Sequence, residues 1–192
     1  MFVYYHFFLY LCDIEKNINI MKYKVIACIN HSLTLGKEGK LLYNISSDLQ
    51  NFKRITNGGV VIMGSKTYES LPRKPLPNRI NIVITRNKDY VANGCIVVHS
   101  IEECIELCER KYHDKECYVI GGGKIYEEFI NRDLVDIMYI TEVNSYDVGD
   151  TFFPNVFMDN DRWYVFYQTD TQYDRPAQMK YFFRIYKRVK EV

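Results

Sequence analysis

The stretch CYVIGGGKIYEEF, residues 117–129, contains the turn that decides the fold. A short apolar run enters three glycines and passes directly into a helical pattern, which predicts a strand followed at once by a helix. Glycines at such a junction leave backbone N–H groups bare, so that a phosphate can approach the helix N-terminus. The stretch is not a G-x-G-x-x-G fingerprint, because Tyr126 stands where the third glycine belongs. A triple glycine alone also fits an ordinary tight turn.

A second junction of the same kind occurs earlier, in VVIMGSKTYESL at residues 60–71. Here Gly64 and Lys66 stand at the start of a predicted helix, and the apolar run INIVIT at residues 80–85 ends next to Arg86. Each feature alone fits a solvated cap or a surface charge. Open α/β sheets bind ligands at the carboxyl ends of their strands, so the shared position of these features favours an extended ligand with several phosphates.

Apolar runs rich in β-branched residues alternate with helical patterns through the rest of the chain. This alternation is typical of βα units on a largely parallel sheet, and continuous hydrophobicity suits strands covered on both faces. The last two runs, separated by a polar connection, predict a terminal antiparallel pair. The expected strands are residues 25–29, 60–63, 80–85, 95–98, 117–120, 136–143, 163–169 and 179–186.

Four helices fit between these strands. Ser47 with Gln50, and Ser100 with Glu103, have the spacing of a capping box and predict two helix starts. Shorter helices are expected after the glycines of the two junctions. The tract of residues 30–44 shows no clean period, which predicts a long loop of the kind that often acts as a lid.

Composition narrows the classes of function. A chain of 192 residues with 47% hydrophobic content is long enough for one sizeable core, and 25 basic against 24 acidic residues give a net charge of +1. No basic face is offered to nucleic acid or to an anionic membrane. The six cysteines lack CxxC spacing, which indicates a reduced, cytoplasmic chain. Cys104 and Cys108 could hold a metal with a nearby histidine, but cysteine on an apolar helix face usually packs, and no metal is expected.

Residues 1–20 differ from the rest, with the run MFVYYHFFLYLC followed by the polar DIEKNINI. The run is shorter than the roughly 20 residues of a membrane span and lacks the charged start and cleavage site of a signal peptide. We expect an extension outside the fold, with the domain at residues 21–192. An additional packing or membrane-contacting segment is the alternative.

Asp48 has two interpretations. An acidic residue in the first turn of a helix is favourable by ~0.3–1 kcal/mol and needs no further role. Alternatively, its carboxylate lies in an apolar pocket and recognises a heterocycle with adjacent N–H donors. The residues expected to flank that pocket are Ile26, Ala27, Leu49 and Phe52. Residue pattern alone leaves both interpretations open.

From Met21 to the C-terminus the chain resembles the dihydrofolate reductase family, with the motifs in the same order and spacing. These motifs are VIACI, SSDLQNFKR, VIMGSKTYESLPRKPLPNRINIVITR, YVIGGGKIYEEF, MYITEV, GDTFFP and YFFRIYKR. The resemblance implies an eight-stranded, mostly parallel mixed sheet with flanking helices in three layers. It also implies reduction of 7,8-dihydrofolate to tetrahydrofolate with NADPH, in support of one-carbon metabolism and the synthesis of thymidylate, purines and glycine.

The resemblance further implies a monomer that binds antifolates such as methotrexate or trimethoprim. Asp48 would hold the pterin 2-amino group and N3, with Thr141 bonding that carboxylate, while hydride transfer to pterin C6 is coupled to protonation of N5. Arg79 would pair with the α-carboxylate of the glutamyl tail. The other substrate contacts implied are Ile26, Ala27, Phe52 and Leu71.

On the cofactor side, the resemblance implies that two helix starts hold the diphosphate and that the tract of residues 30–44 closes over the nicotinamide. Gly122, Gly123, Lys66 and Thr67 would lie at the diphosphate. The remaining cofactor contacts implied are Ala27, Gly36, Leu41, Gly64, Ser65, Thr85, Arg86, Ile120, Gly121, Lys124, Ile125 and Tyr126.

Two departures from the family pattern matter. Many members carry Pro-Trp where this chain has Leu42-Tyr43, so the tryptophan's water-mediated contact to substrate passes to the Tyr43 hydroxyl, a catalytic role, or is lost. Ser65 replaces a basic residue common in bacterial members, and Arg86 is placed to bind the adenosine 2′-phosphate instead.

Two rival functions remain. The reductase of riboflavin synthesis shares the architecture but takes a ribosylated pyrimidine, and Asp48, Phe52 and Arg79 together favour a folate. The second rival is a binding protein that has kept the fold and lost turnover, a hypothesis motivated by the altered Leu42-Tyr43 pair.

Overall fold

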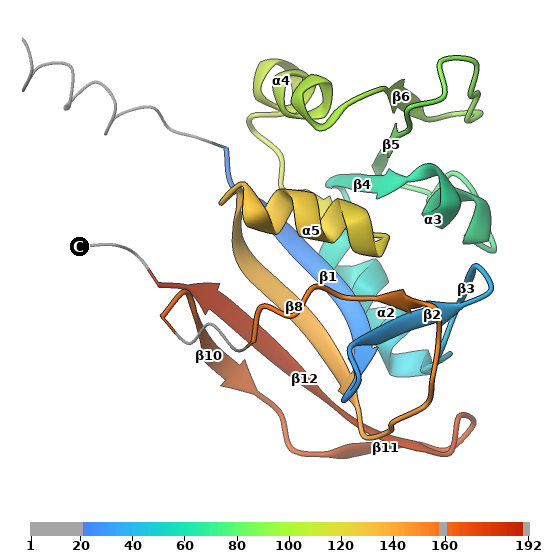
Figure 1. The fold of residues 1–192 in the computed structure, drawn as a ribbon, viewed down its shortest axis with the longest axis vertical. Helices are drawn as coiled ribbons and strands as arrows, with labels where there is room; N and C mark the ends of the chain where they lie inside the picture. The colour runs from blue at the N-terminus through green and yellow to red at the C-terminus, as the bar shows by residue number, and fades with distance from the viewer. Residues whose placement is uncertain (1–20, 158–160, 190–192) are drawn as a thin grey trace, which may run out of the picture.

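The structure is a computed structural model that describes residues 21–157 and 161–189 (Figure 1). The prediction that residues 1–20 form an extension concerns residues outside this description. The elements alternate between strands and helices over most of the chain, as the pattern of apolar runs predicts, and end in strands only.

The main sheet is mixed and mostly parallel, as expected. Its path of eight strands has the order β10-β12-β8-β1-β7-β4-β5-β6, and a further short strand, β11, pairs with β12. The terminal strands β10 and β12 are antiparallel to each other, which confirms the predicted pair. The strand bounds are β1 Tyr23–Asn30, β4 Val60–Gly64, β5 Ile80–Ile84, β6 Ile96–Val98, β7 Cys117–Val119, β8 Val135–Val143, β10 Trp163–Gln168, β11 Gln172–Asp174 and β12 Met179–Arg188.

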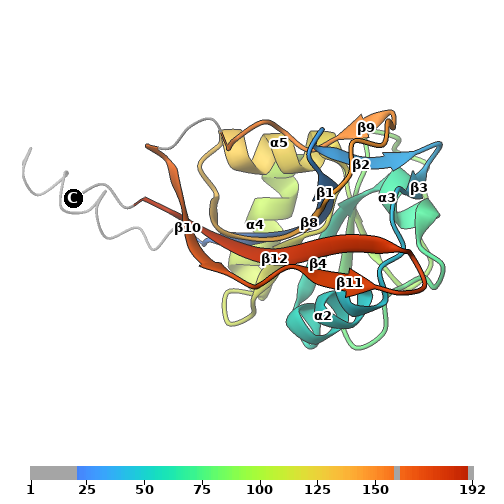
Figure 2. The ribbon, with the colours of Figure 1, turned by 90° about the horizontal axis from the view of Figure 1, so that it is seen from below.

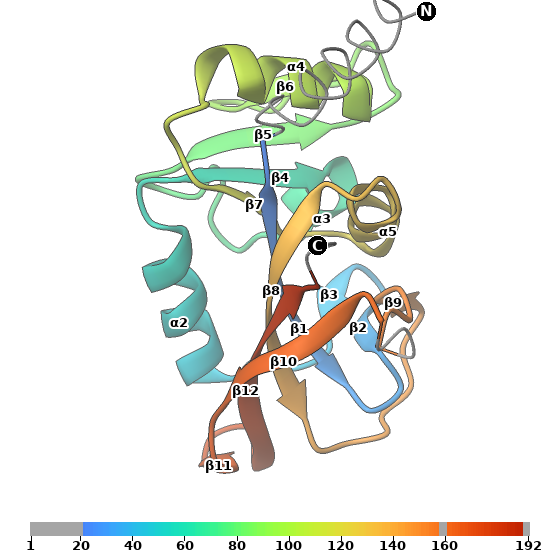
Figure 3. The same cartoon turned by 90° about the vertical axis from the view of Figure 1, so that its left-hand side faces the viewer.

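In the described residues, four helices cover the two faces of this sheet and give three layers. Alternate side chains of a strand point to opposite faces, so Val25 packs in the same core cluster as residues of α4 and α5, whereas Ile26 packs with Tyr68 of α3 and with residues of α2. Figures 2 and 3 show α2 and α5 on opposite sides of the sheet. The helix bounds are α2 Ser46–Thr56, α3 Ser65–Ser70, α4 Ile101–Lys111 and α5 Gly123–Asn131.

The prediction of a plain loop at residues 30–44 is wrong, because this tract contains a hairpin. Its strands β2 (Thr34–Lys37) and β3 (Lys40–Leu41) are antiparallel, and β2 also pairs with β9 (Thr151–Phe152). The two turn residues, Glu38 and Gly39, both have positive φ, at 51° and 73°. Two such residues make the tight turn whose twist matches a hairpin. The partner strand β9 is far away in sequence, so local periodicity could not reveal this sheet.

One of the two predicted capping boxes is present and one is not. Ser100 Oγ accepts from the Glu103 backbone N–H at 3.1 Å and caps α4. At α2, by contrast, the N-cap is Ile45 without a side-chain bond. The backbone N–H of Ser46 donates instead to Asp174 Oδ2 on β11 at 3.1 Å. The helix thus begins one residue before the predicted cap, and a carboxylate more than a hundred residues away satisfies its first N–H group.

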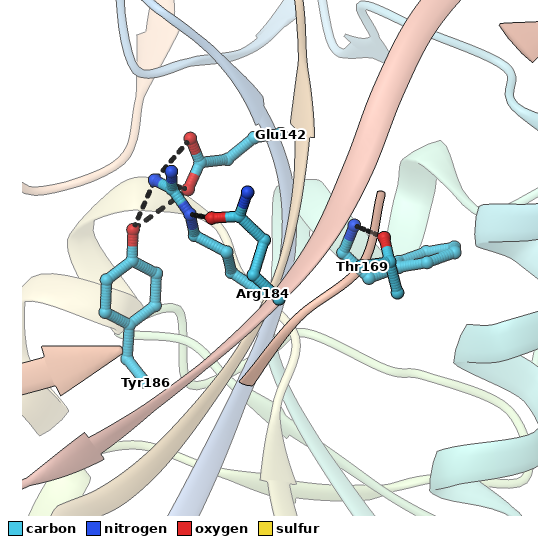
Figure 4. A network of polar contacts seen from close by, with 6 residues as sticks. Glu142, Thr169, Arg184 and Tyr186 are labelled. Atoms are coloured by element: carbon cyan, nitrogen blue, oxygen red, sulfur yellow. Dashed lines mark hydrogen bonds and ion pairs between the residues drawn. The ribbon is translucent and has the colours of Figure 1, made fainter. Parts of the chain in front are cut away.

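Polar side chains of β8 and β12 form a hydrogen-bonded network (Figure 4). Arg184 Nη1 donates to both carboxylate oxygens of Glu142, at 2.9 and 3.1 Å, and to the Tyr186 hydroxyl at 3.1 Å. Tyr186 in turn donates to Glu142 at 2.9 Å. Burial raises the pKa of Tyr186 to about 12, so the hydroxyl keeps its proton at neutral pH. The charges of this network are thus neutralised within the chain.

The cysteines of α4 pack into the core, as expected for an apolar helix face. Cys104 and Cys108 have no exposed surface, and the five cysteines in the described ranges are free thiols. No cluster of potential ligands suited to a metal ion occurs among residues 21–157 and 161–189. In the same ranges no helix is long and apolar enough to cross a membrane.

Candidate active site

Asp48 lies in the first turn of α2 and faces strand β8. Thr141 Oγ1, on a side chain that is 3% exposed, donates to Asp48 Oδ1 at 2.5 Å. Burial raises the pKa of Asp48, and the bond from Thr141 opposes that rise without cancelling it. No cation in the described part of the chain forms an ion pair with this carboxylate. The group is therefore both poorly solvated and electrically uncompensated, which suits a ligand that brings N–H donors or positive charge.

The walls around Asp48 come from β1, α2 and the end of α3. Ile26 and Ile120 belong to one buried cluster, against which Phe52 and Leu71 pack. Of the residues predicted to flank Asp48, Leu49 is 43% exposed and is the least enclosed. These residues give Asp48 apolar surroundings on the α2 side of the sheet.

Ala27 lies on the opposite face of β1 from Ile26. It packs in the cluster that contains Tyr126. The structure therefore places the Ala27 side chain on the same side of the sheet as α5, and its predicted contacts with substrate and cofactor both stay predictions. This separation follows from strand alternation, which the sequence prediction had not applied to these two neighbours.

Cys28 is a site neighbour that the sequence prediction missed. It is opposite Thr141 in the register of β1 and β8. Burial raises the pKa of its thiol, and the nearby Asp48 charge adds to the effect. The thiol therefore stays protonated beside the carboxylate. The parallel pairing of β1 with β8 could not be read from local sequence, so no signal pointed to this contact.

Arg79 is held at the end of the pocket by neutral groups. Its Nη1 donates to Thr56 Oγ1 and its Nε donates to the Pro77 carbonyl, both at 3.0 Å, and its guanidinium lies 5.6 Å from the centre of the Phe52 ring. Within the described residues it has no carboxylate partner. A guanidinium that is fixed in place but not neutralised is suited to a carboxylate ligand.

A further group of polar side chains, on the exposed face of α2, was not predicted. These residues project from one side of α2 at helical spacing and line a shallow surface cavity: Gln50, Lys53, Arg54 and Asn57. The i, i+3 and i+4 spacing of the group was visible in the sequence, but it fits a solvated helix face equally well. Lys53 and Arg54 place two positive charges on this face of α2.

The two predicted glycine junctions lie side by side, because β4 and β7 are neighbouring parallel strands. The Gly64 N–H donates to the Gly121 carbonyl at 2.8 Å and links the two turns directly. Gly121 has a φ of +118°, which side chains rarely adopt, and a Cβ on Gly123 would lie 2.4 Å from the Phe152 carbonyl oxygen. Glycine is thus required at both positions.

The first backbone N–H groups of α5 are left without a side-chain cap. Its N-cap is Gly122, whose missing Cβ would lie 3.3 Å from Thr67 Oγ1. The Thr67 hydroxyl and these N–H groups therefore lie next to each other at the same edge of the sheet. Backbone N–H groups without a partner at the N-terminus of a helix can bind an anion.

Three cations surround this edge. Lys66, Lys124 and Arg86 are exposed, and none forms an ion pair or hydrogen bond with the residues that the structure describes. The pairing of Gly64 with Ile84 brings the following residues, Ser65 and Thr85, to the same edge. Separate unpaired cations beside bare N–H groups fit a ligand with more than one phosphate.

The start of α5 is fixed to the pocket through Tyr126. Its buried hydroxyl donates to the Ile26 carbonyl at 2.8 Å, and burial raises its pKa. Ile125 lies against Gly64, where an added Cβ would be 3.3 Å from the Ile125 Cγ1 atom. We call the edge formed by the two glycine turns, the start of α5 and the three cations the phosphate edge. The Tyr126 bond joins this edge directly to β1, beside Asp48.

The β2–β3 hairpin borders the same edge. Gly36 and Leu41 pair with each other across it, and Leu41 is 62% exposed. The hairpin is joined to the glycine turn through Phe152, which pairs with β2 and whose carbonyl lies next to Gly123. The position of the hairpin suits a flap over a ligand bound there.

Tyr43, predicted to contact substrate, is 7% exposed, and its hydroxyl is engaged elsewhere. It accepts from Asn30 Nδ2 at 3.0 Å and donates to Asp147 Oδ2 at 3.2 Å. Sequence reasoning missed Asn30 and Asp147, because they lie more than a hundred residues apart and belong to no local motif. The substrate contact of Tyr43 stays a prediction.

The sheet has glycine turns and unpaired cations at one edge, next to one carboxylate in apolar surroundings. This combination defines the class of α/β enzymes that bind a phosphorylated cofactor beside a polar heterocycle. Comparison with known proteins identifies the family within this class. The family model described as dihydrofolate reductase matches residues 22–188. The chain belongs to the dihydrofolate reductase family.

Individual relatives agree with this assignment. The dihydrofolate reductase of Staphylococcus haemolyticus is 33% identical over 90% of this chain and 99% of its own length. That of Neisseria gonorrhoeae is 40% identical over 75% of this chain and 85% of its own length. Among solved structures, dihydrofolate reductase from Enterococcus faecalis complexed with NADP(H) and RAB-propyl has a TM-score of 0.78 and 32% identity, covering 88% of this chain and 97% of that one.

Proposed function

We propose that Asp48, bonded by Thr141, is the group that binds and activates the pterin in the reaction of this enzyme. As a dihydrofolate reductase, the chain is an NADP-dependent oxidoreductase that reduces 7,8-dihydrofolate to 5,6,7,8-tetrahydrofolate with NADPH. The single observation that supports the assignment is the partly buried carboxylate, which has no cation partner among the described residues and lies in apolar surroundings. Its two oxygens can accept from two adjacent N–H donors of the pterin, the 2-amino group and N3.

The chain's own groups prepare the pterin for reduction. Asp48 stabilises positive charge on the ring and so favours the form protonated at N5. Ile26, Phe52 and Leu71 exclude water, which strengthens the attraction between the carboxylate and that charge. Arg79 holds the α-carboxylate of the glutamyl tail and fixes the position of C6 relative to the cofactor side. When bound, NADPH supplies the hydride that C6 accepts.

The residues of the phosphate edge fit NADPH. Bare N–H groups at Gly122 and Gly123, the hydroxyl of Thr67 and the charge of Lys66 would hold the diphosphate. Arg86 would bind the adenosine 2′-phosphate, since Ser65 offers no charge. Ala27, Ile120 and Tyr126 would lie toward the nicotinamide, under the hairpin that carries Gly36 and Leu41. The remaining groups of the edge, Gly64, Thr85, Gly121, Lys124 and Ile125, would complete the binding surface.

The domain and its setting are part of the same proposal. The fold begins at Met21, which is supported by the family match that starts at residue 22, and residues 1–20 are an extension. The enzyme acts as a monomer in the cytoplasm, makes no contact with nucleic acid or membrane, and uses no metal. Antifolates such as methotrexate and trimethoprim compete with dihydrofolate for Asp48.

One assay tests this proposal against its two rivals. NADPH absorbance is followed with dihydrofolate, with and without methotrexate, and separately with a ribosylated pyrimidine, and the binding of NADPH and dihydrofolate is titrated alongside. We expect oxidation of NADPH that depends on dihydrofolate and stops with methotrexate. Oxidation only with a ribosylated pyrimidine would identify the riboflavin-type reductase. Binding of both ligands without oxidation would mean that the fold has kept recognition and lost turnover.

A further inference from the structure

Asn30, the last residue of β1, uses every hydrogen-bonding position of its side chain. Its Oδ1 accepts from the backbone N–H groups of Ser32 and Thr34, each at 3.0 Å. Its Nδ2 donates to the Tyr43 hydroxyl at 3.0 Å and to the Asp147 carbonyl at 2.8 Å. An amide has two acceptor and two donor positions. At 2% exposure, this side chain is a saturated internal connector.

The Tyr43 hydroxyl completes the arrangement. It accepts from Asn30 and gives its one proton to Asp147 Oδ2 at 3.2 Å. Burial raises the pKa of Tyr43, so the hydroxyl stays protonated at neutral pH. A phenol has a single proton to donate. Tyr43 therefore cannot donate to substrate or water without releasing Asp147. We call the side chains of Asn30, Tyr43 and Asp147 the Asn30 clasp.

The clasp lies at the base of the β2–β3 hairpin. Asn30 precedes the hairpin and Tyr43 follows it, and both are tied to Asp147 on the segment that leads to β9. A second attachment lies at the hairpin's tip, where the Glu38 N–H donates to Asp150 Oδ2 at 2.7 Å. The tip bond is exposed and competes with water, whereas the bond between Asn30 and Tyr43 is buried and the two bonds to Asp147 are part-buried. The base bonds are therefore better shielded from water than the tip bond, and they add to the pairing of β2 with β9.

We propose that the Asn30 clasp positions the hairpin for hydride transfer, and that Tyr43 acts through the clasp rather than as a proton donor. Asn30, Tyr43 and Asp147 are thus positioning residues. The proposal rests on the proposed function, in which Gly36 and Leu41 of the hairpin cover the cofactor. Asn30 and Tyr43 are both buried, whereas Asp147 is exposed. Because loss of either buried partner leaves a polar group of the other unsatisfied, Asn30 and Tyr43 work as a unit.

Two conservative variants separate the parts of the clasp. Tyr43→Phe removes only the hydroxyl. Asn30→Asp keeps the acceptor for Ser32 and Thr34 but loses both donors. Tyr186→Phe is the matched control, because it removes another hydroxyl that donates to a carboxylate, in the β8–β12 network. Each variant is compared with the parent by single-turnover hydride transfer and by hydrogen exchange of the amides of residues 34–42.

We expect each clasp variant to slow hydride transfer by roughly tenfold, the typical effect of one hydrogen bond to a charged group. The double variant should be no slower than the slower single variant, because both break the same unit. Amides of residues 34–42 should exchange faster in both variants, while those of β1 and β8 keep the parent's rates. Tyr186→Phe should match the parent in hydride transfer and in exchange of the hairpin.

Two results would overturn the proposal. Slow hydride transfer in Tyr43→Phe with unchanged exchange would show that the hydroxyl acts on the substrate directly. Unchanged exchange together with unchanged transfer would show that the clasp positions nothing. Exchange is measured on the protein alone and needs no turnover. If the parent failed to reduce dihydrofolate, the proposed function would fail while the exchange result still decided whether the clasp holds the hairpin.

Discussion

The two faces of strand β8 carry carboxylates in opposite electrical states. On one face Thr141 meets Asp48, which has no cation partner among the described residues. On the other face the next residue, Glu142, is neutralised by Arg184 and bonded by Tyr186 (Figure 4). Alternation along a strand is enough to separate a charge reserved for a ligand from a charge used for stability. A charge left without a partner in a folded domain is costly, which makes such charges the better guide to the site.

The same contrast applies to the cations. Arg79 and Arg86 have no carboxylate partner in the part of the chain that the structure describes, whereas Arg184 has two bonds to one. The two arginines without a carboxylate partner lie in the candidate site, and Arg184 lies outside it. Predictions based on this contrast concern which variants change turnover and which change stability.

The largest effect is expected for Asp48→Asn. The amide keeps the volume of the side chain but cannot pair ionically with the pterin or favour protonation at N5. Positioned proton chemistry contributes ~10²–10⁴-fold, and we expect single-turnover hydride transfer at neutral pH to fall within that range. Lower pH should restore part of it, since solvent then protonates dihydrofolate. A loss below about tenfold would reduce Asp48 to a helix-terminal charge.

The stability of Asp48→Asn gives an independent test. The pKa of Asp48 is raised in the folded protein, so the carboxyl's favourable contribution is full below the ordinary value of about 3.9 and is lost as pH rises through the folded pKa. Without ligand, the variant should therefore match the parent in acid and exceed it at neutral pH. Urea unfolding at several pH values measures this. A variant less stable than the parent at neutral pH would contradict it.

Arg86→Ala should have the second largest effect, on cofactor binding. A charge-assisted contact to phosphate contributes ~1.5–3 kcal/mol, or roughly tenfold or more in affinity. We expect NADPH to be weakened by at least that factor and NADH much less, as measured by fluorescence titration. Arg110→Ala, which removes an exposed cation in the last turn of α4, is the control. Equal weakening of both cofactors would place Arg86 outside the 2′-phosphate site.

Glu142→Gln should show the opposite behaviour to Asp48→Asn. Arg184, whose side chain is 28% exposed, would lose the charge of a partner that is 15% exposed. We expect the free energy of unfolding to fall by about 1–3 kcal/mol while hydride transfer stays within about twofold. The double variant with Arg184→Met should be less destabilised than the sum of the single variants. A large loss of turnover at unchanged stability would contradict the view that the Glu142 face of β8 serves stability and the Asp48 face serves turnover.

Local sequence predicts many of the strands and helices but few of the contacts between residues distant in sequence. The apolar runs at residues 60–63 and 117–120 became β4 and β7 because burial on both faces leaves a continuous local signal. Ser47 is not the N-cap because the helix begins one residue earlier, at Ser46, whose N–H donates to Asp174, a residue remote in sequence. The hairpin at Gly36 depends on β9, and its Glu-Gly turn is a weaker signal than Asn-Gly.

The candidate site divides in the same way. The glycine junctions could be predicted from the residues alone, since a strand, glycines and a helix are contiguous. Asp48 could not, because its environment is made by Thr141 and Cys28 of strands distant in sequence, and family resemblance was needed to choose its role. Asn30 was missed for the same reason, since its four bonds appear only when the chain has folded.

The smallest effect is expected from removing residues 1–20. Both faces of β8, the phosphate edge and the Asn30 clasp lie within residues 22–188, the range that the family model matches. A chain starting at Met21 should therefore keep the parent's hydride transfer and unfolding free energy. Starting the chain at Val25 is the matched control, because it removes Tyr23, which has no exposed surface and stacks edge-on against Phe129; loss of such a side chain costs about 3–5 kcal/mol. The control should aggregate or lose turnover. If the chain starting at Met21 did the same, the apolar run MFVYYHFFLYLC would be part of the core. The contrast between paired and unpaired charges within residues 22–188 would then no longer be enough to explain turnover and stability.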